Sequence, residues 1–339
     1  MRIMDDVAAR FSTPVPDVLG EPWQARTLTL ADDGEASPPV ATLVQRAPSA
    51  GAPAEPGMRR AVLYIHGFVD YFFQTHHAET WEECGFTFYA LDLRDYGRSI
   101  RAGRRPNWML DLAIYDEEIS AAIALLRASH DEIVLAGHST GGLIVSLYTA
   151  RHPGDVAGLM LNSPWLDLNE PWFTRKVAAP ILRRIGHLIP HAPISSLGSG
   201  YGQSLHSSTG GEWTYELEWK PFEGFGVYAG WLAAVLKGHR AVAHGLDLTV
   251  PVLMATSGAR GDNKKPSAEE LRTTDVVLSP PQMWHRAAGL GRDVTVVRIN
   301  GGRHDLTLSE QPARERFERE LSAWLKARFP VAGNRPLVA

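Results

Sequence analysis

The sequence predicts an α/β fold in which helices cover both faces of a mostly parallel β-sheet, and two patterns carry this prediction. First, short runs of strand-forming residues alternate with helical patterns from about residue 59 onward. These runs lie at 61–65, 86–91, 133–136, 159–161, 250–255 and 294–299. Such alternation is typical of βαβ units. Second, most of the runs are continuously apolar, as expected of parallel strands that are covered on both faces.

Helices are expected between these strands. In the range 112–126 the apolar residues recur at steps of three and four, which places them on one face of an amphipathic helix. The ranges 141–151 and 312–328 have the same character, and Pro153 ends the first of them.

The N-terminal part is predicted to form an antiparallel hairpin at the edge of the sheet. Its two segments, 24–30 and 40–46, flank a turn that contains Asp32, Asp33 and Gly34. Acidic residues followed by glycine favour a chain reversal. The hairpin therefore precedes the first parallel strand.

Residues 164–245 interrupt the alternation of strands and helices and are interpreted as an insertion between two strands. Within it we expect a helix, a Gly/Ser-rich loop, an extended segment with an aromatic face, and a second helix. These elements are expected at 175–189, 195–211, 213–219 and 225–243. The remaining ranges, 1–163 and 246–339, then form one core, although 339 residues also suit two domains.

Composition excludes several classes of protein. The formal net charge is −4 and no cluster of lysine or arginine occurs, so a nucleic-acid partner is not expected. No run approaches the ~18 apolar residues of a membrane span, and Met1 to Phe11 lacks the apolar core of a signal peptide. The single cysteine, Cys84, is expected to be a buried, inert thiol at a helix end. We therefore expect a cytoplasmic protein.

The strongest local motif is Gly137-His138-Ser139-Thr140-Gly141, which directly follows one predicted strand and directly precedes a helix. A serine at such a tight turn is held in strained backbone geometry, and small residues two positions away let strand and helix approach closely. The hydroxyl of Ser139 is then exposed at a helix N-terminus, where the N–H of Thr140 is free to donate to an oxyanion. Ser139 is the predicted nucleophile, and the alternative is a simple helix N-cap.

A second oxyanion donor is expected from the turn after an earlier strand. His66-Gly67-Phe68 follows the run 61–65, so the N–H of Phe68 is the candidate, and His66 is interpreted as a structural histidine. The general base is expected after the last strand. His304 lies there in a glycine-containing turn that could bring its imidazole over the serine.

The acid that orients His304 has three candidates. Asp262 lies in a polar run that predicts a solvated loop, and Asp167 follows an earlier strand. Asp275 precedes three apolar residues and a helix, a setting that would bury its carboxylate, and it lies 29 residues before His304 (304 − 275). We therefore favour Asp275, because the acid must be held rigidly against the imidazole.

Other histidines are given non-catalytic roles. His76 and His77 are interpreted as a solvated helix surface rather than a metal site. The segment 206–211 repeats part of the serine motif, but no strand precedes it, so it is predicted to be a loop. Neither an HExxH motif nor a pair of CxxC motifs occurs, so no metal is expected.

Together these motifs resemble the α/β-hydrolase superfamily, and within it the branch of monoacylglycerol lipases and lysophospholipase-like hydrolases that is grouped with serine aminopeptidases. The resemblance rests on 66–68, 91–99, 137–142 and 302–305 and covers roughly residues 25 to 329. It implies the α/β-hydrolase fold, a mobile cap formed by 164–245, and structural roles for Arg94 and Arg98. Two features depart from the family pattern: Asp95 stands where glycine is usual, and the loop before Asp275 is long.

The resemblance also implies hydrolysis of carboxylic esters through an acyl-enzyme, without a cofactor. The expected partner is a small acyl ester, such as an acylglycerol or a lysophospholipid, and a homodimer is left open. Tyr71, Trp165, Trp172 and Trp231 are candidates for the substrate pocket, with ordinary packing as the alternative. A serine aminopeptidase, which could bind a free amine through the acidic residues at 212–223, and a non-catalytic binding protein are the alternative functions.

Overall fold

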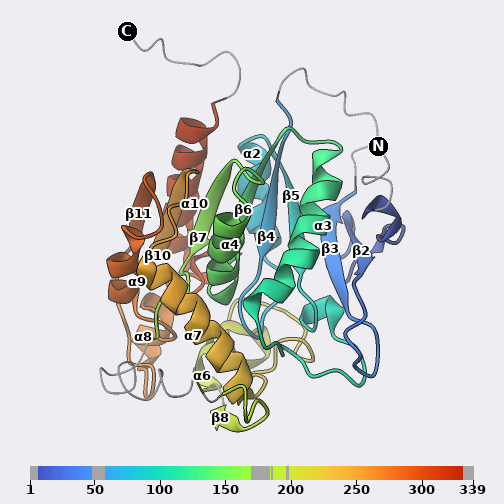
Figure 1. Ribbon diagram of the computed structural model, residues 1–339. Coiled ribbons are helices and arrows are strands. Elements are labelled where there is room, and N and C mark those ends of the chain that lie inside the picture. Colours follow the sequence, from blue (N-terminus) through green and yellow to red (C-terminus); the bar gives the residue numbers. More distant parts are fainter. Residues whose placement is uncertain (1–6, 48–57, 169–183, 185, 196–197, 331–339) are drawn as a thin grey trace.

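The computed structural model describes residues 7–47, 58–168, 184, 186–195 and 198–330. In this part of the chain, a nine-stranded sheet has the order β1-β2-β3-β5-β4-β6-β7-β10-β11 (Figure 1). Its strands are β1 (Val15–Pro16), β2 (Trp23–Thr29), β3 (Val40–Arg46), β4 (Arg60–Ile65), β5 (Phe86–Asp92), β6 (Glu132–His138), β7 (Gly158–Asn162), β10 (Val252–Ser257) and β11 (Val294–Ile299). The strands from β5 to β11 in this order pair in parallel, whereas β1, β2, β3 and β5 pair antiparallel. The predicted parallel sheet and N-terminal hairpin are confirmed.

Helices cover both faces of the sheet because apolar side chains alternate between the faces along each central strand. In β4, Ala61, Leu63 and Ile65 pack into one core, whereas Val62 and Tyr64 pack into the other. The first core is covered by α3 (Asp116–Arg127), α4 (Thr140–Arg151), α7 (Ala229–His244) and α9 (Pro280–Ala287), and the second by α2 (Thr75–Glu83) and α10 (Gln311–Arg328). No helix in the described ranges has the length and apolar character needed to cross a bilayer.

The helix predicted at 112–126 begins with a tighter turn. Residues Leu112–Tyr115 form a 3₁₀ turn, in which the side chain of Asp111 accepts a hydrogen bond from the N–H of Ala113. The α-helix starts at Asp116 with three acidic residues in its first turn, which suit the positive end of the helix dipole.

The insertion between β7 and β10 lies near the carboxyl ends of the parallel strands (Figure 1). Its described part contains a small antiparallel sheet of β8 (Pro193–Ser195) and β9 (Val227–Tyr228), the short helix α6 (Gly200–Leu205) and α7. The helix predicted at 225–243 is confirmed as α7. The helix predicted at 175–189 lies mostly outside the described residues.

The loop prediction for 195–211 is wrong in part, because this segment contains α6 and a 3₁₀ turn at Ser207–Thr209. Leu205 is fully buried in a cluster with Tyr71 and Phe73 of the core. Packing of this side chain therefore outweighs the low helix propensity of the glycines and serines around it.

The prediction of an extended segment at 213–219 is also wrong. Trp213 forms a single bridge with His206, and the chain then turns, since the carbonyl of Glu216 accepts hydrogen bonds from the N–H groups of Trp219 and Lys220. The turn aims successive side chains in different directions: Tyr215 is buried whereas Leu217 is 37% exposed.

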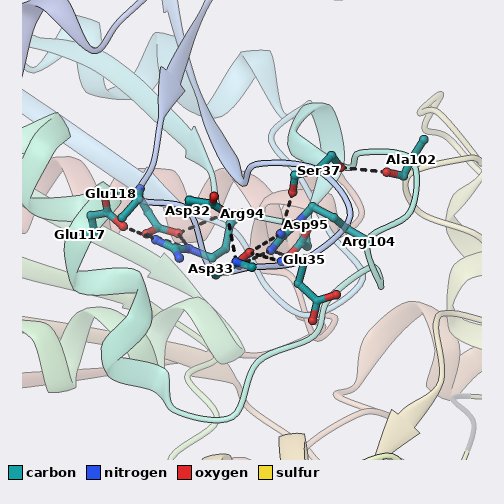
Figure 2. A network of polar contacts seen from close by, with 12 residues as sticks. Asp32, Asp33, Glu35, Ser37, Arg94, Asp95, Ala102, Arg104, Glu117 and Glu118 are labelled. Carbon is teal, nitrogen blue, oxygen red and sulfur yellow. Dashed lines mark hydrogen bonds and ion pairs between the residues drawn. The ribbon is translucent and has the colours of Figure 1, made fainter.

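A network of ion pairs ties the hairpin to the segment that follows β5 (Figure 2). The guanidinium of Arg104 contacts both carboxylate oxygens of Asp95, at 2.7 and 2.9 Å, and also pairs with Asp33 in the turn between β2 and β3. Asp95 has a φ of 64°, a conformation that favours glycine. The paired guanidinium gives a physical reason for aspartate at this position, where the family pattern has glycine.

Candidate active site

The turn between β6 and α4 presents Ser139 with a positive φ of 53° and a ψ of −116°, a strained combination for a residue with a side chain. Both flanking glycines are sterically required. A Cβ atom on Gly141 would lie 2.3 Å from the carbonyl oxygen of His66, and one on Gly137 would lie 2.7 Å from the carbonyl oxygen of Gly141. The spacing of the Gly-x-Ser-x-Gly motif therefore follows from the close contact of α4 with β6 and β4.

Three side chains from distant parts of the sequence meet at this turn. The Oγ atom of Ser139 lies 3.0 Å from Nε2 of His304, and Nδ1 of His304 lies 2.9 Å from Oδ2 of Asp275. Ser139 is 8% exposed, His304 4% and Asp275 0%. The arrangement can pass a proton from the hydroxyl to an imidazole whose other nitrogen faces a carboxylate.

Asp275 is held as an anion in the interior. Burial by itself raises its pKa, but the charge of His304 and the hydrogen bonds from His304 and from the N–H groups of Leu278 and Val277 outweigh burial, so the pKa lies below its ordinary value. The other two candidate acids lie elsewhere. Asp262 is exposed, and Asp167 pairs with Arg286.

The turn that follows β4 packs directly against the serine. A Cβ atom on Gly67 would lie 3.2 Å from Cβ of Ser139, so only glycine fits without displacement. In the described part of the chain, neither the N–H of Phe68 nor that of Thr140 donates a hydrogen bond to another group. Both are available to a ligand oxygen beside Ser139.

His66 has the structural position expected from the sequence. Its Nε2 accepts a hydrogen bond from the N–H of Leu93, and its Nδ1 donates to the carbonyl of Gly67. The ring is buried, and burial lowers its pKa. His66 thus joins the end of β4 to the segment after β5.

Asp305, next to His304, is a buried anchor that the sequence analysis did not single out. Its carboxylate accepts hydrogen bonds from Asn162, from the hydroxyl and N–H of Thr307, and from Gln74. Burial by itself raises its pKa, but the charge of His138 and the hydrogen bonds from Thr307 and Asn162 outweigh burial and hold the pKa at about 2. The sequence signal for Asp305 is its place directly after the predicted base, in the turn that follows the last strand.

A second buried carboxylate, Asp70, lies close to this anchor and was also missed. Asp70, His138 and Asp305 offer ligand atoms that all lie within 4.8 Å of one another. This geometry could accept a cation, and the ammonium of Lys220 lies 2.5 Å from Oδ1 of Asp70. A side chain of the insertion thus supplies a positive charge at this cluster.

The four aromatic residues expected at the substrate pocket do not form one group. Trp231 packs on Phe68, with 4.2 Å between ring centroids, and its ring lies 5.8 Å from that of Trp165. The backbone N–H of Trp165 donates to the carbonyl of Ser139. Tyr71 instead packs with Phe73 and residues of the insertion. Trp172 lies outside the described residues.

The surroundings expected for His76, His77 and Cys84 differ from those in the structure. His77 is buried and contacts Glu318 of α10, and His76 stacks on Trp213, so this pair does not form a solvated surface. Cys84 lies at the end of α2 as expected, but it is only partly buried.

The amino-acid sequence matches a known protein family. A family model described as "Serine aminopeptidase, S33" matches residues 56–311, which include all three side chains of the Ser139 site. The chain belongs to the serine aminopeptidase S33 family.

The similar sequences cover part of this S33 chain. A monoacylglycerol lipase of Mycolicibacterium smegmatis is 30% identical over 142 residues, which are 41% of this chain and 49% of that protein. The superfamily protein YisY of Bacillus subtilis is 32% identical over 37% of this chain and 43% of its own length. The chain thus matches about half the length of these relatives.

Solved structures match the S33 chain over most of its length. A soluble variant of the monoglyceride lipase of Saccharomyces cerevisiae has a TM-score of 0.63 at 14% identity and covers 94% of this chain and 97% of its own. A carboxyl esterase of Bacillus coagulans has a TM-score of 0.59 at 13% identity, with coverages of 89% and 98%. At these identities the likeness shows the α/β-hydrolase fold.

Proposed function

We propose that this S33-family chain is a serine hydrolase that cleaves carboxylic esters through an acyl-enzyme, with Ser139 as nucleophile, His304 as general base and Asp275 as the orienting acid. The continuous chain of contacts from Oγ of Ser139 through His304 to the carboxylate of Asp275 carries the proposal. The strained turn that presents Ser139 supports it, because such geometry is characteristic of nucleophiles held between a strand and a helix.

The reaction proceeds in two halves. Oγ of Ser139 attacks the ester carbonyl carbon while Nε2 of His304 takes the hydroxyl proton. Collapse of the tetrahedral intermediate breaks the bond to the alcohol oxygen, which receives the proton from Nε2. Water then attacks the acyl-enzyme with the same base, and the carboxylic acid leaves as Ser139 regains its proton. Asp275 keeps the imidazole in the tautomer with a proton on Nδ1 and stabilises the imidazolium.

The oxyanion of each intermediate is held by the N–H groups of Phe68 and Thr140. The close packing of Gly67 on Ser139 supports this role, because it brings the turn after β4 beside the nucleophile. Two fixed donors act on charge that develops only in the transition state, and loss of one costs about 10²- to 10³-fold in kcat in a related mechanism.

The substrate is proposed to be a small acyl ester, such as an acylglycerol or a lysophospholipid. Trp231 and Trp165 support an apolar wall beside the oxyanion donors, since Trp231 packs directly on Phe68. Residues 164–245 are proposed to act as a cap on the core of 1–163 and 246–339. The names of the lipase relatives favour the same substrate class.

An aminopeptidase is the second candidate, since the family description names this activity. The acidic residues of the insertion offer it little support. Glu212 pairs with Arg314 on α10, and Glu216, Glu218 and Glu223 are exposed. None of them contacts Ser139 or His304 in the described structure, so a site for a free amine has no evident anchor.

Labelling with a fluorophosphonate probe tests the nucleophile. We expect the purified protein to be labelled, and Ser139→Ala to lose all labelling. Ser163→Ala is the matched control, because Ser163 is also buried at the end of a parallel strand but contacts neither His304 nor Asp275. A folded wild type that takes no label would support the non-catalytic alternative.

A substrate panel separates the two activities. Turnover is measured on p-nitrophenyl esters of increasing chain length and on aminoacyl anilides. We expect hydrolysis of the esters with kcat/KM at least 100-fold above that of any anilide. A preference for anilides would overturn the esterase assignment in favour of the aminopeptidase.

A further inference from the structure

The insertion reaches the catalytic core through a buried ion pair. Lys220 lies in the turn after Tyr215, and its Nζ is 2.5 Å from Oδ1 of Asp70 in the segment after β4. The side chain of Lys220 is 14% exposed and that of Asp70 is 2% exposed. The ammonium also lies 5.7 Å from the ring centroids of Phe73 and Tyr215. The pair is therefore largely removed from water, where removal of one partner is costly.

Asp70 in turn holds the turn that carries the proposed oxyanion donor. Its Oδ2 accepts the N–H of Gly67 at 3.3 Å, and Nζ of Lys220 lies 3.5 Å from the carbonyl oxygen of Val69. Phe68 lies between these two anchored residues. The direction of its N–H thus depends on contacts to the same carboxylate and ammonium.

The backbone of this turn is strained. Val69 has a φ of 51°, which is unusual and strained for a β-branched residue. Its N–H donates to Oδ1 of Asn107 at 2.9 Å. Such a conformation persists only where surrounding contacts hold it, and Asn107, Asp70 and Lys220 supply them.

The charge balance around Asp70 gives Lys220 a second role. The carboxylate of Asp305 lies within 4.8 Å of Asp70 and His138 as part of the same cluster. Burial lowers the pKa of His138, whereas the neighbouring charges of Asp305 and Asp70 raise it. Without Lys220, the buried carboxylates of Asp70 and Asp305 would lose a nearby positive charge, and their mutual repulsion would act on the turn.

We propose that Lys220 is a positioning residue: the insertion uses its ammonium to hold Asp70, and through Asp70 the Phe68 N–H, at the oxyanion site. The inference rests on the proposed serine-hydrolase function. It assigns to the insertion a part in transition-state stabilisation, in addition to any contact with substrate.

The test compares Lys220→Met, Lys220→Arg, Asp70→Asn and the double variant Lys220→Met/Asp70→Asn on one short-chain p-nitrophenyl ester. We expect Lys220→Met to lower kcat by about 10- to 100-fold with KM within about twofold, since oxyanion contacts act on the transition state. Lys220→Arg should recover most of the loss. The double variant should be no slower than Lys220→Met, because both changes remove the same pair.

A trifluoromethyl ketone gives a readout that a general structural role would not move. Ser139 adds to its carbonyl carbon, the proton passes to His304, and the resulting hemiketal oxygen occupies the oxyanion site. Its inhibition constant should rise in Lys220→Met by the same factor as kcat/KM falls, while the pH dependence of kcat/KM stays unchanged. Lys237→Met is the matched control. Lys237 also belongs to the insertion, but its ion pair with Asp111 is exposed, so this substitution should leave all constants unchanged.

The outcomes separate the two proposals. If the wild type hydrolyses no ester and takes no fluorophosphonate, the proposed function fails. If the wild type is active but Lys220→Met keeps its kcat or its affinity for the ketone within twofold, the role of Lys220 alone is refuted. If Lys220→Met does not fold, Asp70→Asn decides, because the proposal requires it to lower kcat and ketone affinity together by about tenfold.

Discussion

The carboxylate of Asp275 reaches Nδ1 of His304 at 2.9 Å even though a loop and α8 (Ala268–Thr273) separate it from the end of β10. The backbone explains how. The N–H of Asp275 donates to the carbonyl of Ala259, and the N–H of Gly261 donates to the carbonyl of Asp275. The two ends of segment 262–274 therefore lie side by side, so that this segment is an excursion from the end of β10. Asp275 lies just beyond the strand in space.

The first prediction concerns this acid. Asp275→Asn should lower kcat by about 10⁴-fold, the effect seen for the corresponding change in a worked triad, because the amide favours the wrong imidazole tautomer. Steady-state hydrolysis of a p-nitrophenyl ester measures it. The control is Asp262→Asn, an exposed residue of the excursion that should retain wild-type kcat. Equal losses in both variants would contradict the assignment.

The second prediction concerns the contact of α4 with the sheet. Gly141→Ala should destabilise the fold by about 3 kcal/mol or more, because the new Cβ would lie 2.3 and 2.4 Å from two backbone oxygens that cannot move independently. Urea denaturation measures the free energy of unfolding. In Gly200→Ala the added Cβ meets no atom within 4 Å, so the change should stay within about 0.5 kcal/mol of zero. A tolerated Gly141→Ala would show that α4 can withdraw from β4.

The third prediction concerns the network in Figure 2. Arg104→Met should cost about 3 kcal/mol, because it leaves the carboxylate of Asp95, whose side chain is 4% exposed, without its partner. Thermal and urea unfolding both report this loss. The comparison is Arg328→Met, which breaks a pair whose partners are 40% and 41% exposed and should cost less than about 1 kcal/mol. Similar costs for the two variants would mean that burial does not govern the Arg104 pair.

The fourth prediction concerns acid stability. The pKa of Asp305 is about 2 in the folded protein, against an ordinary value of 3.8, so the unfolded chain takes up this proton first as the pH falls. Its contribution of about 2 kcal/mol is thus complete above pH 4 and is lost as the pH falls toward 2. The gap in unfolding free energy between wild type and Asp305→Asn should narrow over this window. A gap that stays constant from pH 6 to pH 3 would argue against the prediction.

Local patterns were enough to predict much of the fold. The continuously apolar runs became the parallel strands, because residues covered on both faces must be apolar at every position. The Gly137-to-Gly141 motif predicted a strained turn between strand and helix, since only glycine permits the approach that Gly141 makes to β4. These features depend on neighbours along the chain, so the sequence displays them directly.

The insertion could not be predicted in the same way. Glycine and serine around Leu205 disfavour a helix, and α6 forms because Leu205 packs into a cluster with Tyr71 and Phe73. The alternating aromatics after Trp213 suggest a strand, but the carbonyl of Glu216 accepts two hydrogen bonds of a turn. In both cases contacts with the core outweigh local propensity.

What the sequence determined by itself was the kind of fold and the residue types for the chemistry, with Ser139 and His304 each located by a motif next to a predicted strand. The sequence favoured Asp275 among three candidate acids, but only the tertiary structure showed that its carboxylate faces His304, because the excursion after β10 conceals how close Asp275 lies to the strand end. The tertiary structure also decided that Lys220 meets Asp70 across 150 residues of sequence. Burial, charge pairing and hydrogen bonding act through space, and no pattern along the chain records those distances.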